Sequence, residues 1–418
     1  MLVALVTAGA PGCGSEPNEP VDAADATTGD VPSGEDSSTG DPPQGDSGDT
    51  GAHRGSGESG ANDDASSSTG EPQVTEPTPW VWSLPPGFPE PYVPEDNPMT
   101  VEKVELGRHL FYDTRLSGNG TYSCATCHDQ ALAFTDGLGQ AVGSTDEVHP
   151  RGSMSLTNIA YASTLAWGNP ELVDLEVHAL GPMFGDAPVE LGLADEAETI
   201  AAIADDPRYD ELFGAAYPHD EAPMTLDHVV QSIASFQRTL ISGRAPFDRW
   251  FFEGDESAIS ESAKRGWELF NFPGECTYCH FNFNFSDSTY FPALPERTKA
   301  FHNTGLYNVD GEGAYPEHNE GLFNFTGDPE DMGKFKSPTL RNIAQTAPYM
   351  HDGSLETLEE VLEHYAVGGR VDSPHADFQM TTFELTPEMV ADFEAFFESL
   401  TDEAFLTDPA FGDPWAER

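Results

Sequence analysis

The sequence predicts a mainly helical protein with two domains of similar plan, preceded by a disordered acidic segment. Apolar residues recur at helical spacing in several stretches, whereas the strict alternation that is typical of half-buried strands is scarce. One pentapeptide pattern occurs twice, each time after a helical stretch and before a long stretch rich in loop residues. The residues before about position 79 are mostly Gly, Ser, Asp, Glu, Thr and Pro.

The first domain is expected to cover residues 80–245. Its first helix is predicted over residues 101–112 and a second over residues 226–240, where the apolar side chains share one face. The cluster Ser-Gly-Arg-Ala-Pro at 242–246 breaks the second helix and marks the expected domain boundary. The second domain then covers residues 246–418.

Three helices are predicted in the second domain. A short helix over residues 263–270 leads to the second copy of the pentapeptide. Thr357 and Glu360 have the spacing of a capping box, which predicts the start of a helix that runs to residue 365. A last helix begins with Thr386 as its cap and is followed by Pro at its first position.

The N-terminal residues predict export rather than a membrane span. Residues 1–13 form a short apolar run that ends in small residues and Cys13, which resembles a lipoprotein-type export signal with Cys13 as the lipidated residue. The run lacks a preceding positive charge, has Ala10 where such signals prefer Leu, and is too short to cross a bilayer. Residues 14–79 bury too little apolar area to fold and are expected to form a flexible acidic tether.

The overall charge limits the classes of partner. With 18 Lys and Arg against 73 Asp and Glu, the formal net charge is −55. This balance argues against nucleic acid as a partner and against anionic membrane surfaces. It is compatible with a cationic redox partner or with a saline habitat, and charge alone does not separate the two.

Four of the five cysteines belong to two Cys-x-x-Cys-His pentapeptides. Each supplies two thiols and an imidazole, namely Cys124, Cys127 and His128 in the first, and Cys276, Cys279 and His280 in the second. Residues i, i+3 and i+4 share one helix face, so two thiols meet the vinyl groups of one haem while the histidine faces the iron. Disulfides and a zinc site are the alternatives, but a zinc site built from the cysteine pairs would not explain the histidine that follows each pair.

The pentapeptides therefore predict two covalently bound haem c groups, with His128 and His280 as proximal iron ligands. The expected fold is accordingly a pair of cytochrome c-like haem domains with long loops. Because haem c is attached outside the cytoplasm, we expect the protein in the periplasm or at the cell surface. The sixth ligand of each iron decides whether that haem binds peroxide or transfers electrons.

Longer phrases of the sequence point to one family. They are LGRHLFYD at 106–113, RLS at 115–117, FKSPTLRN at 335–342 and TAPYMHDG at 346–353. On these phrases, the chain from about Pro85 to Ala404 resembles the bacterial di-haem cytochrome c peroxidase/MauG superfamily. Two further phrases, HPRGSMSL at 149–156 and PMFG at 182–185, are most similar to the MbnH-type branch. The resemblance implies that the first domain reacts with peroxide and that the second transfers electrons.

The resemblance also implies a ligand for the second haem iron. Members of the superfamily carry either Met or Tyr fourteen residues after the histidine of the YMHDG-type phrase, and here Tyr365 follows His351 at that distance. A phenolate stabilises oxidised iron, whereas a thioether stabilises reduced iron. Met350 is the rival ligand, and a core position on the predicted helix is the alternative role of Tyr365.

In the first domain the family has a peroxide pocket with a Gln, a Pro and a Glu. Glu190 and Pro182 match two of these positions, while His178 stands where the family usually has Gln. A buried Glu190 would stay protonated near neutral pH and shuttle a proton to peroxide. His178 would hydrogen-bond peroxide or ligate the resting iron. The alternative for each of Glu190 and His178 is a surface position without a role in the pocket. His149 falls near a displaceable ligand of classical peroxidases, and we expect it to be a solvent-exposed loop residue.

Two further features follow from the resemblance. Trp167 matches a tryptophan between the two haems, where an indole can carry an electron hole; a plain core role is the alternative. Asn158, Thr346 and Pro348 match positions whose oxygens bind an interdomain calcium ion, a cation that takes amide and carbonyl oxygens readily.

The function implied by the resemblance is a MauG/MbnH-like oxidase. Such an enzyme uses H₂O₂ to form a high-valent haem state and oxidises an aromatic residue, Trp in the MbnH-type branch, of a secreted, MbnP-like copper-binding partner. The second hypothesis is a di-haem peroxidase that reduces H₂O₂ to water with electrons from a small cytochrome or cupredoxin. The third is an electron carrier without enzymatic activity, which the pocket around Glu190 disfavours.

Overall fold

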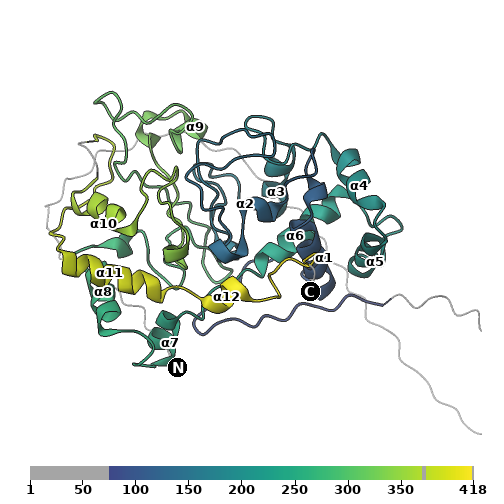
Figure 1. Ribbon diagram of the computed structural model, residues 1–418, viewed down its shortest axis with the longest axis horizontal. Coiled ribbons are helices and arrows are strands. Elements are labelled where there is room, and N and C mark those ends of the chain that lie inside the picture. The colour runs from purple at the N-terminus through teal and green to yellow at the C-terminus, as the bar shows by residue number, and fades with distance from the viewer. Residues whose placement is uncertain (1–74, 370–372, 417–418) are drawn as a thin grey trace, which may run out of the picture. The chain divides into compact units, whose positions relative to one another are not determined.

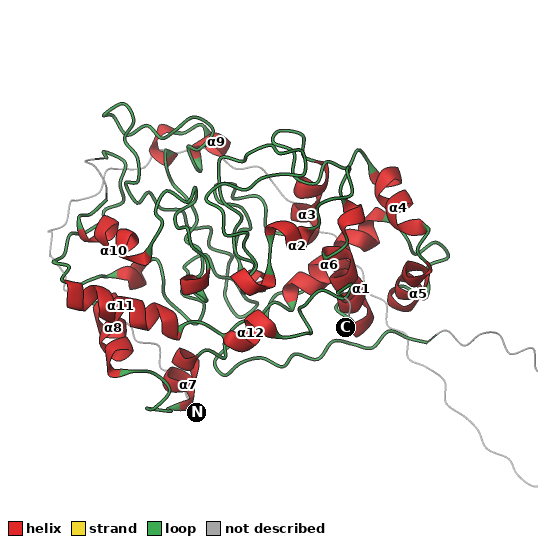
Figure 2. Ribbon diagram, viewed as in Figure 1, coloured by secondary structure: helices red, strands yellow, loops and turns green. Residues whose placement is uncertain are grey.

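Helices and long loops make up the described structure, and no β-sheet occurs in it (Figures 1 and 2). The computed structural model describes residues 75–369 and 373–416. The prediction of a mainly helical fold is confirmed. The expected export signal, Cys13 and all but the last residues of the expected tether lie outside the described residues. No helix in the described ranges is both long and apolar enough to cross a membrane.

The α-helices among the described residues include all five that the sequence predicts. They are α1 Val101–Phe111, α2 Cys124–Cys127, α3 Leu175–Phe184, α4 Glu196–Ala204, α5 Pro207–Ala216, α6 Leu226–Arg238, α7 Pro246–Glu253, α8 Glu261–Asn271, α9 Phe323–Thr326, α10 Leu358–Ala366, α11 Pro387–Ser399 and α12 Glu403–Thr407. The predicted capping box of α10 is present, since the Thr357 hydroxyl accepts from the Glu360 N–H and the Glu360 carboxylate accepts from the Thr357 N–H.

Each of the two haem-motif regions is built on its own pair of packed helices. Helix α1 packs on α6, and α8 packs on α11 (Figure 1). A glycine lies at each crossing: a Cβ at Gly107 would stand 1.8 Å from the Ser232 carbonyl oxygen, and one at Gly266 would stand 1.9 Å from the Asp392 carbonyl oxygen. Only glycine allows the two backbones to approach this closely.

A second repeated feature is an asparagine that binds the segment just after a long helix, α6 in the first half and α11 in the second. Asn158 and Asn342 both adopt left-handed backbone conformations, with φ values of 58° and 61°. Their side-chain oxygens accept hydrogen bonds from the backbone N–H groups of Ser242 and Asp402, both at 2.8 Å. The two copies meet where the Asn342 amide donates to the Ser242 hydroxyl at 3.1 Å.

Two apolar cores follow the same division. The larger contains residues of α1, α3, α4, α5 and α6, and the smaller contains residues of α7, α8, α10 and α11. Phe405 and Leu406 of α12 pack in the first core, although they follow the second core in the chain. The domain boundaries at 245 and 246 stay a prediction.

Candidate haem centres

The first pentapeptide forms a single helical turn. Helix α2 contains Cys124 and Cys127, and the His128 N–H donates to the Cys124 carbonyl at 3.0 Å. The His128 Nδ1–H donates to the Phe134 carbonyl oxygen at 2.9 Å, which fixes the ring and directs Nε2 to a metal. Burial lowers the pKa of His128, so the imidazole is neutral, as an iron ligand must be.

The second pentapeptide repeats this arrangement. The His280 N–H donates to the Cys276 carbonyl at 2.9 Å, and His280 Nδ1–H donates to the Phe285 carbonyl oxygen at 2.9 Å. Phe134 and Phe285 both have positive φ values, 61° and 50°. This conformation is uncommon for bulky residues, so each loop is held in a strained form that supplies the acceptor for its histidine.

A large cavity adjoins the second pentapeptide. It encloses about 2140 Å³ of empty space, including the part that is open to solvent, and Cys276, Cys279 and His280 line it. Tyr365 of α10 lines the same cavity, and no residue of the described structure hydrogen-bonds its hydroxyl. Burial, and then the neighbouring cysteine thiols, raise the pKa of Tyr365. The cavity therefore brings a phenol to the attachment site that the sequence assigned to the second haem.

Met350, the rival ligand, has apolar neighbours. It also lines the cavity, but its side chain packs against the small apolar cluster of Leu306, Tyr315 and Phe335. The adjacent His351 stacks on Phe335 with ring centroids 3.6 Å apart, and burial lowers its pKa to about 4.

The predicted peroxide-pocket residues gather near the first pentapeptide. Glu190 is close enough to raise the pKa of Cys124, although burial is the larger cause. Burial lowers the pKa of His178, on α3, to about 4, and His128 contributes to this shift. Pro182 lies one turn further along α3, and its carbonyl accepts from the Leu191 N–H at 2.9 Å, which ties the Glu190 loop to the helix.

Glu190 is half-buried and its neighbour is His149. Burial raises the pKa of Glu190, and His149 opposes the shift. The expectation that His149 is solvent-exposed is wrong: the residue is half-buried, and its Nε2 is buried without a hydrogen-bond partner in the described structure. The reason is a backbone hydrogen bond from the His149 N–H to the Ala141 carbonyl, at 2.8 Å, which folds this loop back on itself.

Trp167 joins the two halves of the described structure. Its indole N–H donates to the Gly152 carbonyl at 3.1 Å, and its own carbonyl accepts from the Lys336 N–H at 2.9 Å. Lys336, which the sequence did not single out, is buried with its ammonium donating to the Thr164 carbonyl at 3.1 Å. Burial lowers the pKa of Lys336 to about 8.

The predicted calcium ligands border one cavity. Asn158, Thr346 and Pro348 all line the cavity of the second pentapeptide. The Asn158 side-chain oxygen already accepts from Ser242, and its amide donates to the Asn284 side-chain oxygen at 3.0 Å. The calcium site stays a prediction.

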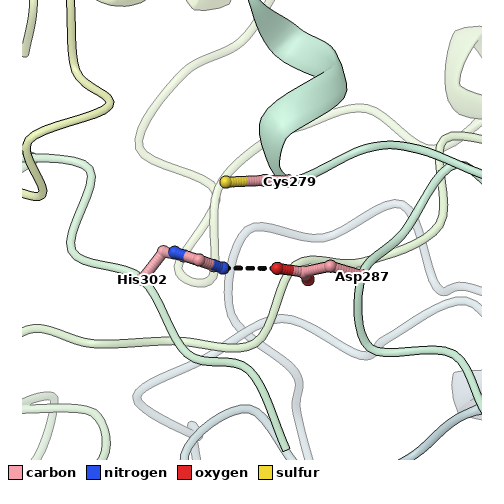
Figure 3. Close-up of side chains that lie close together, drawn as sticks. All are labelled: Cys279, Asp287 and His302. Atoms are coloured by element: carbon pink, nitrogen blue, oxygen red, sulfur yellow. Dashed lines mark hydrogen bonds and ion pairs between the residues drawn. The ribbon is translucent and has the colours of Figure 1, made fainter. Parts of the chain in front are cut away.

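A hydrogen-bonded chain beside Cys279 was not predicted from the sequence. His302 donates from Nε2 to Asp287 at 2.6 Å and from Nδ1 to Asp377 at 2.8 Å (Figure 3 shows the first of these bonds). Burial lowers the pKa of His302, but the two carboxylates, together with the Cys279 thiol, outweigh it and raise the pKa to about 12. Ligand atoms of Cys279, Asp287 and His302 lie within 4.8 Å of one another. No sequence signal links residues this far apart in the chain.

Comparison with known proteins identifies the family of this chain. The family model described as di-haem cytochrome c peroxidase matches residues 101–257. Methylamine utilization protein MauG of Methylorubrum extorquens is 38% identical over 312 residues, which cover 74% of this chain and 81% of that protein. The chain belongs to the di-haem cytochrome c peroxidase/MauG family.

The relatives include proteins named MauG and proteins named cytochrome-c peroxidase. Cytochrome-c peroxidase IdrP1 of Denitromonas iodatirespirans is 34% identical over 343 residues, covering 77% of this chain and 86% of that protein. The crystal structure of a MauG-like protein associated with microbial copper homeostasis is 44% identical, with a TM-score of 0.78, and covers 80% of this chain and 99% of that one.

Membership of this family makes the chain a peroxide-dependent di-haem oxidoreductase with two haem c cofactors. The residues fit the cofactor, because each centre offers two thiols, an imidazole oriented through Nδ1 and, at the second, an open cavity faced by a phenol.

Proposed function

We propose that the protein uses H₂O₂ to oxidise an aromatic residue, specifically Trp, of a secreted partner protein, as a MauG/MbnH-like enzyme. The observation that carries this proposal is the position of Tyr365 in the cavity beside Cys276 and Cys279. A phenolate ligand stabilises oxidised iron. A haem with this ligand is suited to holding oxidising equivalents and is a poor acceptor of electrons from a small donor protein.

The residues near the first pentapeptide support a reaction with peroxide. The two bound haems supply redox-active iron. Glu190 is suited to hold a proton and donate it to peroxide, because burial favours its protonated form. His178 stays neutral at pH 7 with its pKa near 4, and can hydrogen-bond peroxide without adding charge. Trp167, in hydrogen-bond contact with both halves, offers an indole to carry charge between the two centres.

The partner and the location belong to the same proposal. The similarity to a MauG-like protein associated with copper homeostasis supports a secreted, MbnP-like copper-binding protein as the substrate. We place the enzyme in the periplasm or at the cell surface, with a lipid anchor at Cys13. A calcium ion held by oxygens of Asn158, Thr346 and Pro348 would stabilise the contact between the two haem domains.

The test is EPR and visible spectroscopy of the ferric holoprotein, with Tyr365→Phe and, as its matched control, Met350→Leu. We expect one high-spin and one low-spin haem, with only Tyr365→Phe changing the low-spin signal. H₂O₂ added with the partner protein should give an oxidised Trp in the partner by mass spectrometry, and Tyr365→Phe should abolish this product.

The alternative is a peroxidase that reduces H₂O₂ with electrons from a small cytochrome or cupredoxin. It is kept because relatives named cytochrome-c peroxidase match most of the chain and because Met350 lines the same cavity. A thioether absorption band that survives Tyr365→Phe and disappears in Met350→Leu would establish the peroxidase and contradict our proposal.

A further inference from the structure

The chain Asp287–His302–Asp377 is fixed at every member by the backbone. His302 and Phe335 exchange two backbone hydrogen bonds, both at 2.8 Å. The Asp287 N–H donates to the Cys279 carbonyl at 2.7 Å, and the Asp377 N–H donates to the Asn303 carbonyl at 2.9 Å. The three side chains are only 11%, 18% and 21% exposed for Asp287, His302 and Asp377. Asp287, His302 and Asp377 therefore form a rigid, mostly buried unit.

This unit carries a net negative charge. Both ring nitrogens of His302 donate to carboxylates, so the ring is an imidazolium between two anions, and the sum is −1. The hydrogen bonds to both carboxylates also raise the pKa of His302, which agrees with this assignment. The second oxygen of Asp287, Oδ1, is buried and has no hydrogen-bond partner in the described structure, so part of the negative charge is not compensated.

The charge lies against the cysteine that attaches the second haem. Figure 3 shows the Cys279 sulfur beside the bond between His302 and Asp287. The three residues resemble a metal site by their donor atoms alone, but the thiol of Cys279 is used when it forms a thioether with haem. The remaining role of the unit is then electrostatic, and burial limits its screening by solvent and salt.

We propose that the Asp287–His302–Asp377 unit lowers the reduction potential of the second haem by holding a net negative charge at its Cys279 edge. A nearby negative charge stabilises ferric over ferrous iron, as a phenolate ligand does from the axial side. The inference rests on haem attachment at Cys279 and not on the identity of the substrate or of the sixth ligand.

The test is a potentiometric titration of the purified holoprotein, with the visible and EPR signals of each haem followed separately. Asp287→Asn should raise the potential of the second haem by at least a tenfold change in its ferric-to-ferrous ratio, which is 59 mV for one electron. His302→Gln removes the positive charge and should lower the potential. Asp392→Asn, which removes a carboxylate of the same half away from the cavity, should change neither haem.

Opposite shifts in the two variants distinguish charge from packing, because a loosened haem edge would move both potentials in one direction. Shifts of the same sign, or no shift, would overturn the proposal, as would a stoichiometric non-haem metal in the holoprotein. If Asp287→Asn fails to bind haem, Asp377→Asn makes the same charge change on the other side of His302. The result is independent of Tyr365→Phe, so the failure of either proposal can be recognised separately.

Discussion

A buried ion pair in the second half offers a sharp test of what holds the second haem centre together. The guanidinium of Arg341 lies 2.6 Å from both carboxylate oxygens of Asp248, and the two side chains are 0% and 1% exposed. Its remaining N–H groups donate to the Phe283 carbonyl, and it lies over the rings of Phe88 and Phe285. We expect Asp248→Asn to leave this guanidinium as an uncompensated buried charge.

The size of the effect follows from burial. Removing one partner of a buried ion pair costs about 3–5 kcal/mol, against a total stability of about 5–15 kcal/mol for a domain. The change multiplies the unfolded fraction roughly 10²- to 10⁴-fold, since about 1.4 kcal/mol corresponds to a factor of ten. Arg341 lies over the ring of Phe285, and the carbonyl of Phe285 orients His280. We therefore expect the low-spin signal of the second haem to change together with the stability.

The assay is denaturant unfolding of the holoprotein, followed by circular dichroism and by haem absorption. The control is Glu261→Gln, since Lys264 and Glu261 lie 2.9 Å apart in the same half but the Glu261 side chain is 81% exposed. Exposed pairs contribute little, so the control should unfold almost as the parent does. Equal losses in the two variants would refute the reasoning, because the expected difference between them comes from the burial of the Arg341–Asp248 pair.

Two further predictions concern the first half. Gly107→Ala should destabilise the protein by about 1–3 kcal/mol because its Cβ would overlap the backbone of α6, whereas Gly214→Ala on α5, with nothing within 4 Å, should stabilise it by about 0.5–1 kcal/mol; thermal unfolding compares the two. Burial favours protonated Glu176, but hydrogen bonds from Arg238 outweigh it and hold its pKa below the usual value. Glu176→Gln should therefore be less stable than the parent at neutral pH. This difference in stability should diminish as the pH falls below about 4.5, when the Glu176 carboxylate of the unfolded parent is already protonated. A difference in stability that stays constant down to about pH 3 would contradict this.

The sequence predicts the attachment of both haems but not how their histidines are oriented. The pentapeptides are local patterns whose spacing alone specifies two thiols and an imidazole on one face. The acceptors for His128 and His280 are backbone carbonyls of Phe134 and Phe285, and their positions depend on a left-handed conformation that neither phenylalanine favours by itself. Tertiary packing imposes that conformation, so no propensity indicates it.

The errors and omissions have the same origin. His149 was expected to be a solvent-exposed loop residue, yet the loop folds back and brings the residue next to Glu190. The partners of His302 come from segments fifteen residues before it and seventy-five residues after it, at Asp287 and Asp377. Contacts of this separation are set by the packing of loops, and a hydrophobic pattern carries no information about them.

The two haem centres share a scaffold and differ in the segments that surround it. Both halves have a glycine at the helix crossing and an asparagine in the left-handed conformation. In both, a phenylalanine in the left-handed conformation supplies the carbonyl that orients the histidine of the pentapeptide. Around the first, α3 brings His178 and the segment after it brings Glu190, two titratable side chains suited to proton transfer. Around the second, α10 brings Tyr365 and the loops bring the anionic unit centred on His302, which are suited to stabilising oxidised iron. The residues that distinguish the centres lie outside the repeated helix pairs, so they can differ without altering the frame that supports the pentapeptides. In the function that we propose, this arrangement separates peroxide chemistry from charge storage within one chain.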